Sequence, residues 1–220
     1  MKKLFITLVC AAFALTGSAQ RASSSSTSFF STESSDQAVT FGIRAGVNFA
    51  SMSFSYDGGN FSPNGNTGFH AGVAVDFPLM KSLYVQSGLY YSVKGAKIGE
   101  SDQEIKLSPA YLELPVLASY RYDFSNAAQL QFNVGPYFAY GVGGSAKAGD
   151  EKIDFFGGED DDDTMGCKRF DMGLQVGAGV TLWRHYYVGV AYEFGFVDMG
   201  RGEDGSVKNK NFMLSVGYQF

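Results

Sequence analysis

Residues 211–220 read NFMLSVGYQF and show a repeat of two residues. Large apolar side chains occupy every second position, and Asn211, Ser215, Gly217 and Gln219 lie on the other face. Because successive side chains of a β-strand point to opposite faces, this period predicts a strand with one apolar face. What covers that face determines the kind of protein. The apolar members are Phe212, Leu214, Val216, Tyr218 and Phe220.

The same alternation returns in seven further segments. No helical stripe competes with it beyond the amino-terminal segment. Residues 112–122 alternate less cleanly than the three segments before them. The seven segments are residues 39–49, 69–77, 83–93, 112–122, 130–142, 170–182 and 186–196.

The connectors between these segments alternate in length. Short ones occupy residues 78–82, 123–128 and 183–185. Long ones occupy residues 54–67, 98–108, 143–169 and 197–209. An even number of strands with short turns at one rim and long loops at the other is typical of membrane barrels. The sequence therefore predicts an all-β fold, an eight-stranded up-and-down antiparallel transmembrane β-barrel whose last strand pairs with the first near Val39.

Side-chain volume predicts which face of each strand points outward. The interior of an eight-stranded barrel is only about wide enough for side chains to fill it, so the bulky set must face outward, where a bilayer is its natural surrounding. Aromatic residues gather near the strand ends, as in the two girdles of membrane barrels. The opposite faces carry Gly42, Gly46, Gly72, Gly88, Gly135, Gly141, Gly173, Gly177, Gly179, Gly189 and Gly217.

The amino-terminal segment has the features of a secretory signal. Lys2 and Lys3 precede an apolar run, and the small residues Gly17 and Ala19 follow it at the spacing that a signal peptidase requires. We expect a signal peptide over residues 1–19, a flexible Ser-rich leader over 20–38 and an outer-membrane barrel domain over 39–220. The apolar run is too short to cross a bilayer as a helix.

Several motifs resemble the PorT-like outer-membrane β-barrel family of Gram-negative bacteria. They are FGIRAGVNFA (41–50), YLELPVLASYRY (111–122), GPYFAYG (135–141), FDMGLQVGAGV (170–180) and the terminal VGYQF. The resemblance implies the barrel fold and location in the cell outer membrane. It also implies that the chain could belong to a protein secretion apparatus. The terminal Phe220 after an alternating strand is similar to the signal that the outer-membrane assembly machinery recognises, so we expect Tyr218 and Phe220 to have a role in assembly.

The polar faces carry charged side chains that would point into the barrel. They could line a gated pore or an active site, but a narrow interior favours pairing of opposite charges, because unpaired buried charges are costly. We therefore expect a plugged interior. The residues are Arg44, His70, Asp76, Lys94, Glu113, Arg121, Asp171 and Glu193.

No catalytic, cofactor-binding or metal-binding residue is assigned. His70, expected near the outer rim, stands six residues from Asp76, about 20 Å along a strand, so the two cannot touch. His185 is expected at the membrane interface in a tight turn. Ser92, Ser119 and Ser215 are interpreted as plain strand residues without the context of a nucleophile.

The acidic loop residues 159–163 allow two interpretations. A solvated loop is favoured, because consecutive carboxylates lack the ligand spacing of an EF-hand. Alternatively, the loop binds divalent cations and bridges to the phosphates of lipopolysaccharide. The triplet Asp163–Met165 also resembles an acceptor for periplasmic O-glycosylation.

The charge balance and the fold together set the expected function. The chain carries 17 basic and 22 acidic side chains, a formal charge of −5, which argues against nucleic acid as a partner. We expect a non-catalytic barrel with a structural or envelope-interaction role, surrounded by outer-membrane lipid and lipopolysaccharide. Both termini would be periplasmic and the long loops extracellular. The alternatives are a secretion component, with an unidentified envelope partner, or a narrow pore for small solutes.

Overall fold

The computed structural model describes most of the chain after the amino-terminal segment. The predicted signal peptide, the leader up to residue 37, the acidic loop residues 159–163 and Asp163 of the predicted glycosylation triplet lie outside the described residues. The described ranges are residues 38–56, 59–61, 64–98, 105–125, 127–148, 151–157, 164–200 and 205–220.

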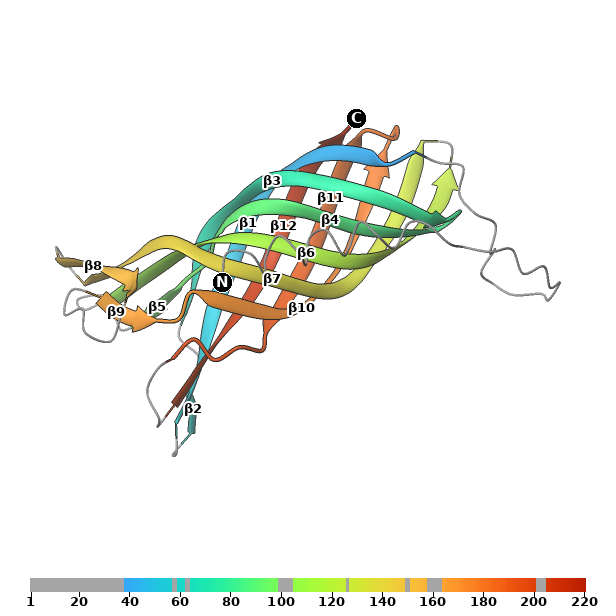
Figure 1. The fold of residues 1–220 in the computed structure, drawn as a ribbon. Helices are drawn as coiled ribbons and strands as arrows, with labels where there is room; N and C mark the ends of the chain where they lie inside the picture. Colours follow the sequence, from blue (N-terminus) through green and yellow to red (C-terminus); the bar gives the residue numbers. More distant parts are fainter. Residues whose placement is uncertain are drawn as a thin grey trace, which may run out of the picture. The chain divides into compact units, whose positions relative to one another are not determined.

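Twelve β-strands make up the described structure (Figure 1). Within these ranges, no helix is long and apolar enough to span a membrane. The strands are β1 (Thr40–Tyr56), β2 (Gly59–Phe61), β3 (Asn64–Met80), β4 (Leu83–Val93), β5 (Ala96–Ile98), β6 (Ile105–Ser125), β7 (Ala128–Ala148), β8 (Glu151–Phe156), β9 (Thr164–Cys167), β10 (Phe170–Leu182), β11 (Tyr186–Gly195) and β12 (Gly205–Gln219).

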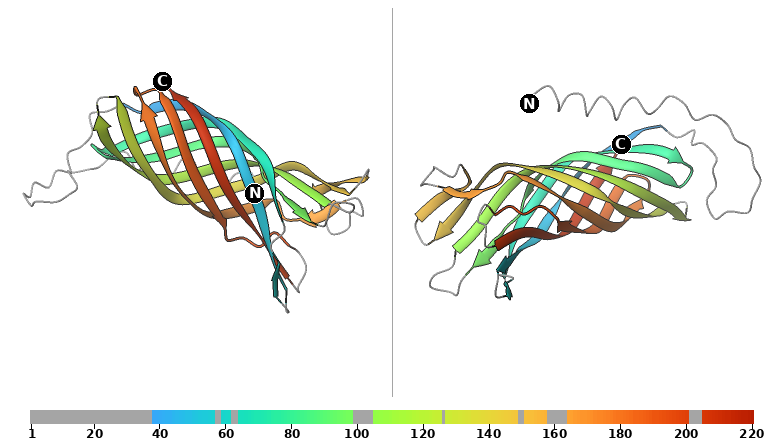
Figure 2. Two further views of the ribbon diagram at one scale, coloured as in Figure 1. Left: turned by 180° about the vertical axis from the view of Figure 1, so that it is seen from behind. Right: turned by 60° about the horizontal axis from the view of Figure 1, so that its bottom comes forward.

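Eight of these strands close into a ring of backbone hydrogen bonds. The order around the ring is β1, β3, β4, β6, β7, β10, β11 and β12, and every neighbouring pair is antiparallel. The first and last strands close it, with Gly42 opposite Gln219 and Phe49 opposite Phe212. The ring has no open strand edge (Figure 2), so the predicted eight-stranded up-and-down barrel and its closure are confirmed.

The structure corrects the predicted lengths of the long loops. Each predicted strand is present, but at the long-loop end β1 continues to Tyr56, β6 begins at Ile105, β7 continues to Ala148 and β12 begins at Gly205. Part of every predicted long loop is therefore strand, including residues 205–209 of the loop predicted over 197–209. The apolar repeat stops earlier than the strands because it reports the lipid-facing part alone, whereas backbone pairing can continue into water.

The turn over residues 183–185 at the other end matches the prediction, whereas strands extend into the connectors predicted over 78–82 and 123–128. Trp183 and Arg184 both have positive φ, 47° and 63°, and the His185 amide donates to the Leu182 carbonyl at 3.0 Å. Two central residues with positive φ form a tight turn whose twist suits a hairpin, and residues 183–185 connect the paired Leu182 and Tyr186. Tyr218 stacks on His185 at 5.4 Å, and Trp183 packs edge-on against Tyr186 at 6.1 Å. These rings form an aromatic cluster at this rim.

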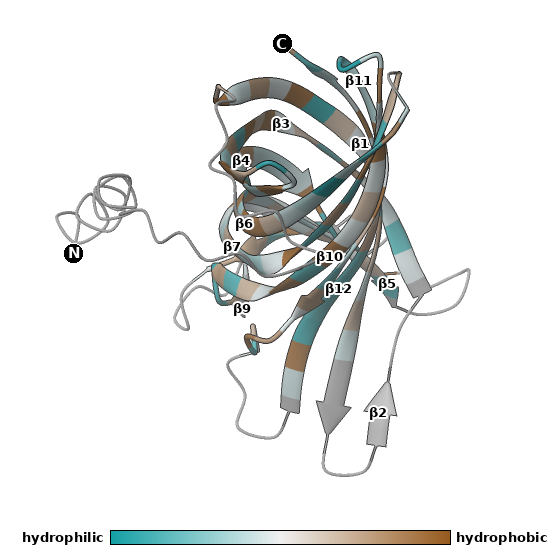
Figure 3. Cartoon of the chain, turned by 90° about the vertical axis from the view of Figure 1, so that its right-hand side faces the viewer, coloured by the Kyte–Doolittle hydropathy of each residue, from teal (hydrophilic) through white to brown (hydrophobic). Residues whose placement is uncertain are grey.

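The bulky side chains point away from the interior, as predicted. Phe132 is 54% exposed and Val190 42%, values that describe a contact with lipid in a membrane barrel. Bands of high and low hydropathy alternate along the strands (Figure 3). On β1 the outward aromatic residues Phe41 and Phe49 are eight positions apart, about 26 Å along the strand, which suits a tilted crossing of the apolar layer. We name this outward apolar zone the lipid belt.

The interior holds more aromatic volume than the sequence analysis allowed. Tyr84, Tyr90, Tyr111, Tyr137 and Tyr187 are all buried there. They fit because glycines stand beside them. A Cβ on Gly72 or Gly88 would fall within 3 Å of the Tyr90 ring, and a Cβ on Gly179 or Gly189 would fall within 3 Å of the Tyr187 ring. These four glycines therefore make room for tyrosine rings, and the interior is filled by larger side chains than expected.

Candidate functional site in the barrel lumen

The first group of lumen residues lies near the short turns and centres on Asp76. Its Oδ2 is 2.7 Å from Arg121 Nη2 and accepts from Gln219 Nε2 at 2.9 Å, while its Oδ1 accepts from Gln86 Nε2 at 2.7 Å. Gln86 Oε1 in turn accepts from Arg44 Nη1 at 2.9 Å. Five strands, β1, β3, β4, β6 and β12, are joined across the lumen by this group.

Both arginines of this group also lie over lumen tyrosines. The Arg44 guanidinium carbon is 3.9 Å from the centre of the Tyr187 ring, and that of Arg121 is 4.1 Å from the centre of the Tyr84 ring. A small recess borders Arg44, Asp76 and Tyr187. Cation–π contacts stabilise both guanidinium groups, and Arg121 also forms the ion pair with Asp76, whereas Arg44 donates to Gln86.

His70 occupies the middle of the lumen. Its Nδ1 is 2.7 Å from Asn48 Oδ1, and its Nε2 is 2.9 Å from Ser215 Oγ. Asn48 donates from Nδ2 to Ser92 Oγ and to the Val93 carbonyl. Its Oδ1 is thereby left as an acceptor, which selects the His70 tautomer protonated on Nδ1. Nε2 then accepts from the Ser215 hydroxyl.

This group corrects two predictions about His70 and the serines. His70 is 2% exposed and lies inside the barrel rather than near the rim, because β3 begins at Asn64 instead of Phe69. Ser215 and Ser92 are members of its hydrogen-bond network rather than plain strand residues. A hydroxyl bonded to an imidazole is the arrangement that activates a nucleophile. In this network the group bonded to the other imidazole nitrogen is the Asn48 amide rather than a carboxylate. Gly46 also packs closely against the ring, since a Cβ at this position would fall 2.6 Å from His70 Cε1.

A second ionic group lies toward the long loops. Lys94 Nζ is 2.6 Å from Glu113 Oε2 and 2.7 Å from Glu193 Oε2, and all three side chains are at most 2% exposed. Asn211 Nδ2 donates to Glu193 Oε2 at 3.0 Å, and Lys94 Nζ lies 4.5 Å from the centre of the Tyr137 ring. One ammonium therefore holds carboxylates from β6 and β11 together across the barrel.

Asp171 extends this group toward the loop end. Its Oδ2 accepts from Asn209 Nδ2 at 2.8 Å and from Tyr137 Oη at 3.2 Å. The Tyr111 hydroxyl donates to Met199 Sδ at 3.1 Å. The polar contacts of this group are therefore followed, toward the long loops, by a layer of apolar side chains.

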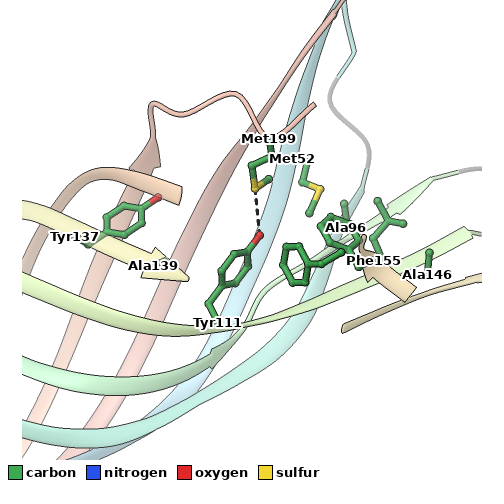
Figure 4. Close-up of a cluster of buried hydrophobic side chains, with 10 residues drawn as sticks. Met52, Ala96, Tyr111, Tyr137, Ala139, Ala146, Phe155 and Met199 are labelled. Atoms are coloured by element: carbon green, nitrogen blue, oxygen red, sulfur yellow. Dashed lines mark hydrogen bonds between the residues drawn. The ribbon is translucent and has the colours of Figure 1, made fainter. Parts of the chain in front are cut away.

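The apolar layer closes the long-loop end of the lumen. Phe155 and Phe156 of β8 are 1% and 4% exposed, and Phe156 packs edge-on against Tyr111 at 5.5 Å. Figure 4 shows Phe155 and Met199 gathered with Met52 and Tyr111 inside the barrel wall. We name this cluster the apolar plug; its buried members are Met52, Ala96, Leu107, Tyr111, Tyr137, Ala139, Ala146, Phe155, Phe156 and Met199.

Sequence reasoning missed the apolar plug because it treated residues 143–169 as one loop. The signal that could have revealed it is the adjacent pair Phe155 and Phe156 in a segment that is otherwise polar. Two large aromatic side chains between charged residues predict that this segment packs against the protein interior.

The predicted lumen residues fall where the alternation placed them. Arg44 is half-buried and the other seven are buried. Pairing of opposite charges is confirmed for Lys94 with Glu113 and Glu193, and for Asp76 with Arg121. Within the described ranges, no three His, Cys, Asp or Glu side chains are grouped closely enough to hold a metal ion.

Comparisons with known proteins agree with this geometry. Residues 19–200 match the family of outer membrane protein β-barrel domains. The chain belongs to this family. It is therefore an integral outer-membrane β-barrel, and its exposed apolar belt contacts lipid. The comparison with curated proteins gives no match.

Solved barrels with a similar fold come from several bacteria. Ail of Yersinia pestis, the attachment invasion locus protein, is 16% identical, with 82% of this chain and 98% of Ail covered at a TM-score of 0.41. Neisserial surface protein A is 13% identical, covering 84% and 100%, at a TM-score of 0.46. The outer membrane protein OprG from Pseudomonas aeruginosa is 13% identical, covering 83% and 96%, at a TM-score of 0.45.

Proposed function

We propose that this outer-membrane barrel is a closed, non-catalytic protein that acts through its ends rather than through its lumen. The observation that carries the proposal is the filling of the lumen by side chains in successive layers. The Asp76 group, the His70 network and the Lys94 group follow one another, and the apolar plug lies beyond them. Each layer connects side chains from several strands, so its first role is to stabilise the barrel wall.

The strand extensions beyond the lipid belt form the proposed interaction surface. There β7 pairs with β6 on one side and with β8 on the other. The side chains of Lys106, Lys147, Lys152 and Ile153 are exposed on them. A rigid paired sheet presents such side chains with less loss of conformational freedom than a mobile loop. We place this end outside the cell and both termini in the periplasm.

Planar-bilayer recordings test the closed lumen against the alternative of a narrow pore. We expect the purified full chain to give no steady channels at any applied voltage. Steady conductance steps from protein free of other porins would refute the proposal. Phe155→Ala/Phe156→Ala removes only the outer layer, so it should also stay silent, and channels from it alone would assign closure to the apolar plug.

Photo-crosslinking in intact cells separates a surface role from a role in a secretion apparatus. A photoreactive residue replaces Ile153 at the long-loop end or Phe124 at the short-turn rim, where both native side chains are exposed. A surface role predicts adducts from position 153. Adducts from position 124 alone would support the secretion apparatus, which the PorT-like resemblance implies and which stays a prediction.

The domain boundaries also remain proposals. We infer cleavage after residue 19, a leader over residues 20–38 and the barrel domain from residue 39. Amino-terminal sequencing of the protein from outer membranes should begin at Gln20. A start at Met1 would refute the signal peptide.

A further inference from the structure

Four lysines stand opposite one another across four neighbouring strands. In register, Lys97 of β5 faces Lys106 of β6, Lys106 faces Lys147 of β7, and Lys147 faces Lys152 of β8. Residues paired in this way project from the same face of a sheet. Four ammonium groups therefore follow one line over three strand intervals, about 14 Å. We name these residues the lysine row.

The lysine row points away from the lumen. Along their strands the adjacent residues Ala96, Leu107 and Ala146 are buried in the apolar plug, so the lysines take the opposite face. Lys106, Lys147 and Lys152 are exposed and Lys97 is half-buried.

The lysine row lies past the end of the lipid belt. Further along the same strands, toward the short turns, the outward side chains are Leu112 and Leu114 of β6 and Tyr140 and Val142 of β7, all exposed and apolar. β5 and β8 lie at this same end of the barrel (Figure 1). The lysines therefore occupy the level at which lipid head groups would begin.

The alignment of Lys106, Lys147 and Lys152 is unfavourable unless an anion is present. Like charges directly opposite on neighbouring strands destabilise a sheet. Across the described part of the chain, no carboxylate forms an ion pair with Lys106, Lys147 or Lys152. Asp154, two positions beyond Lys152 on β8, is exposed nearby. The whole chain is acidic, so this line of positive charge is local.

We propose that the lysine row binds phosphate groups of lipopolysaccharide in the outer leaflet. An anionic glycolipid in that leaflet presents several phosphates at the level of the row, and a line of ammonium groups can contact more than one of them. Binding reduces the repulsion between Lys106, Lys147 and Lys152, so the ligand also stabilises the strand extension.

Titration of the folded full chain in zwitterionic detergent micelles tests the site. The probes are rough-type lipopolysaccharide and the same material with its phosphates removed. We expect at least about tenfold tighter binding of the phosphorylated form, because each lysine near an anionic surface adds about a factor of five. Raising the salt concentration should weaken this preference.

A matched pair of double variants assigns the binding to the row. Lys106→Gln/Lys147→Gln should weaken binding about tenfold, whereas Lys106→Arg/Lys147→Arg should retain it. The control is Lys208→Gln/Lys210→Gln on β12, which removes the same charge from the opposite wall, where the paired residues are Ser53 and Ser51. Circular dichroism should show that all variants are folded.

Three outcomes would overturn the proposal. They are equal binding of both lipopolysaccharides, equal losses from the two glutamine variants, and displacement by inorganic phosphate at equal phosphate concentration, which would indicate an unspecific anion site. The proposal uses the orientation given under the proposed function. Micelles have no inner or outer side, so failure here would refute the lysine row and leave the closed lumen and the orientation untouched.

Discussion

At the scale of single residues, Lys94 forms two buried ion pairs across the lumen. It lies between Glu113 and Glu193 at 2.6 and 2.7 Å, away from solvent. Removing it would leave two carboxylates in the lumen without their cation, which is far costlier than replacing all three groups.

We predict that Lys94→Met lowers the free energy of unfolding by about 3–5 kcal/mol. Denaturant unfolding in micelles measures this loss. The triple variant Lys94→Met/Glu113→Gln/Glu193→Gln should recover most of the stability because no charge then stays unpaired. Equal stabilities for the single variant and the native chain would show that the group does not hold the wall.

The fit between glycine and tyrosine gives a second prediction at this scale. A Cβ on Gly179 would fall 2.4 Å from Tyr187 Cε2, and Gly189 confines the same ring closely. We predict that Gly179→Ala destabilises the barrel by about 1–3 kcal/mol, the usual effect of overpacking. Thermal or denaturant unfolding gives the value.

Gly143→Ala is the matched control for this change. A Cβ there meets nothing within 4 Å, and the residue has no positive φ. Its stability should stay close to that of the native chain. If both alanine variants lost stability equally, backbone freedom rather than contact with Tyr187 would explain the glycines.

How far single residues could be predicted from the sequence depends on what sets their position. Whether a residue faces the lumen or the lipid follows from whether its position in the strand is odd or even. Lys94, Asp76 and Arg121 were therefore assigned correctly to the lumen. The hydrogen-bond and ion-pair partners of a lumen residue could not be predicted from the sequence, because the two residues of a contact often come from strands that are far apart in the chain. His70 with Ser215, 145 positions apart, is such a case.

At the scale of strands, β12 closes the ring. The Phe220 amide donates to the Phe41 carbonyl at 2.8 Å, and the Phe220 ring packs edge-on against Tyr218 at 5.4 Å. Because the ring is 70% exposed, an effect of its removal on assembly can be separated from an effect on stability.

We predict that Phe220→Ala lowers the amount of barrel in outer membranes but changes the unfolding free energy of refolded protein by less than about 1 kcal/mol. The backbone hydrogen bond persists in the variant, whereas the proposed recognition by the assembly machinery needs the ring. Immunoblots of membrane fractions measure the first quantity. Phe212→Ala, in the same strand and also lipid-facing, should reach the membrane normally, and equal amounts of both variants would contradict the assigned role.

The strands were predictable where lipid imposes the repeat and unpredictable beyond it. β10 ends at Leu182, as the alternation indicates. β7 runs on through Gly144, which has a φ of 144°, and shifts register with β6 between Ala110 and Tyr111. This irregularity changes which positions face outward. Lys147 and Ala146 therefore lie on faces that the earlier part of the strand would not predict.

At the scale of the whole molecule, eight strands determine both closure and the small size of the lumen. Their number and the alternating connector lengths were readable from the sequence, so the fold was too. The apolar plug was not, because Phe155 and Phe156 reach the lumen through a segment with no repeat. The ion pairs and hydrogen bonds among the lumen side chains explain why a chain with so many interior charges can form a closed barrel.

The account depends on the bulky faces lying against acyl chains, and tryptophan quenching by brominated lipids tests this most directly. The chain has a single tryptophan, so Trp183→Phe removes the background. In that variant we place Phe132→Trp, Val190→Trp or, as the lumen control, Tyr137→Trp, in bilayers with and without bromine on the lipid chains. We predict strong quenching at positions 132 and 190 and little at 137; strong quenching at 137 with none at 132 and 190 would contradict the account.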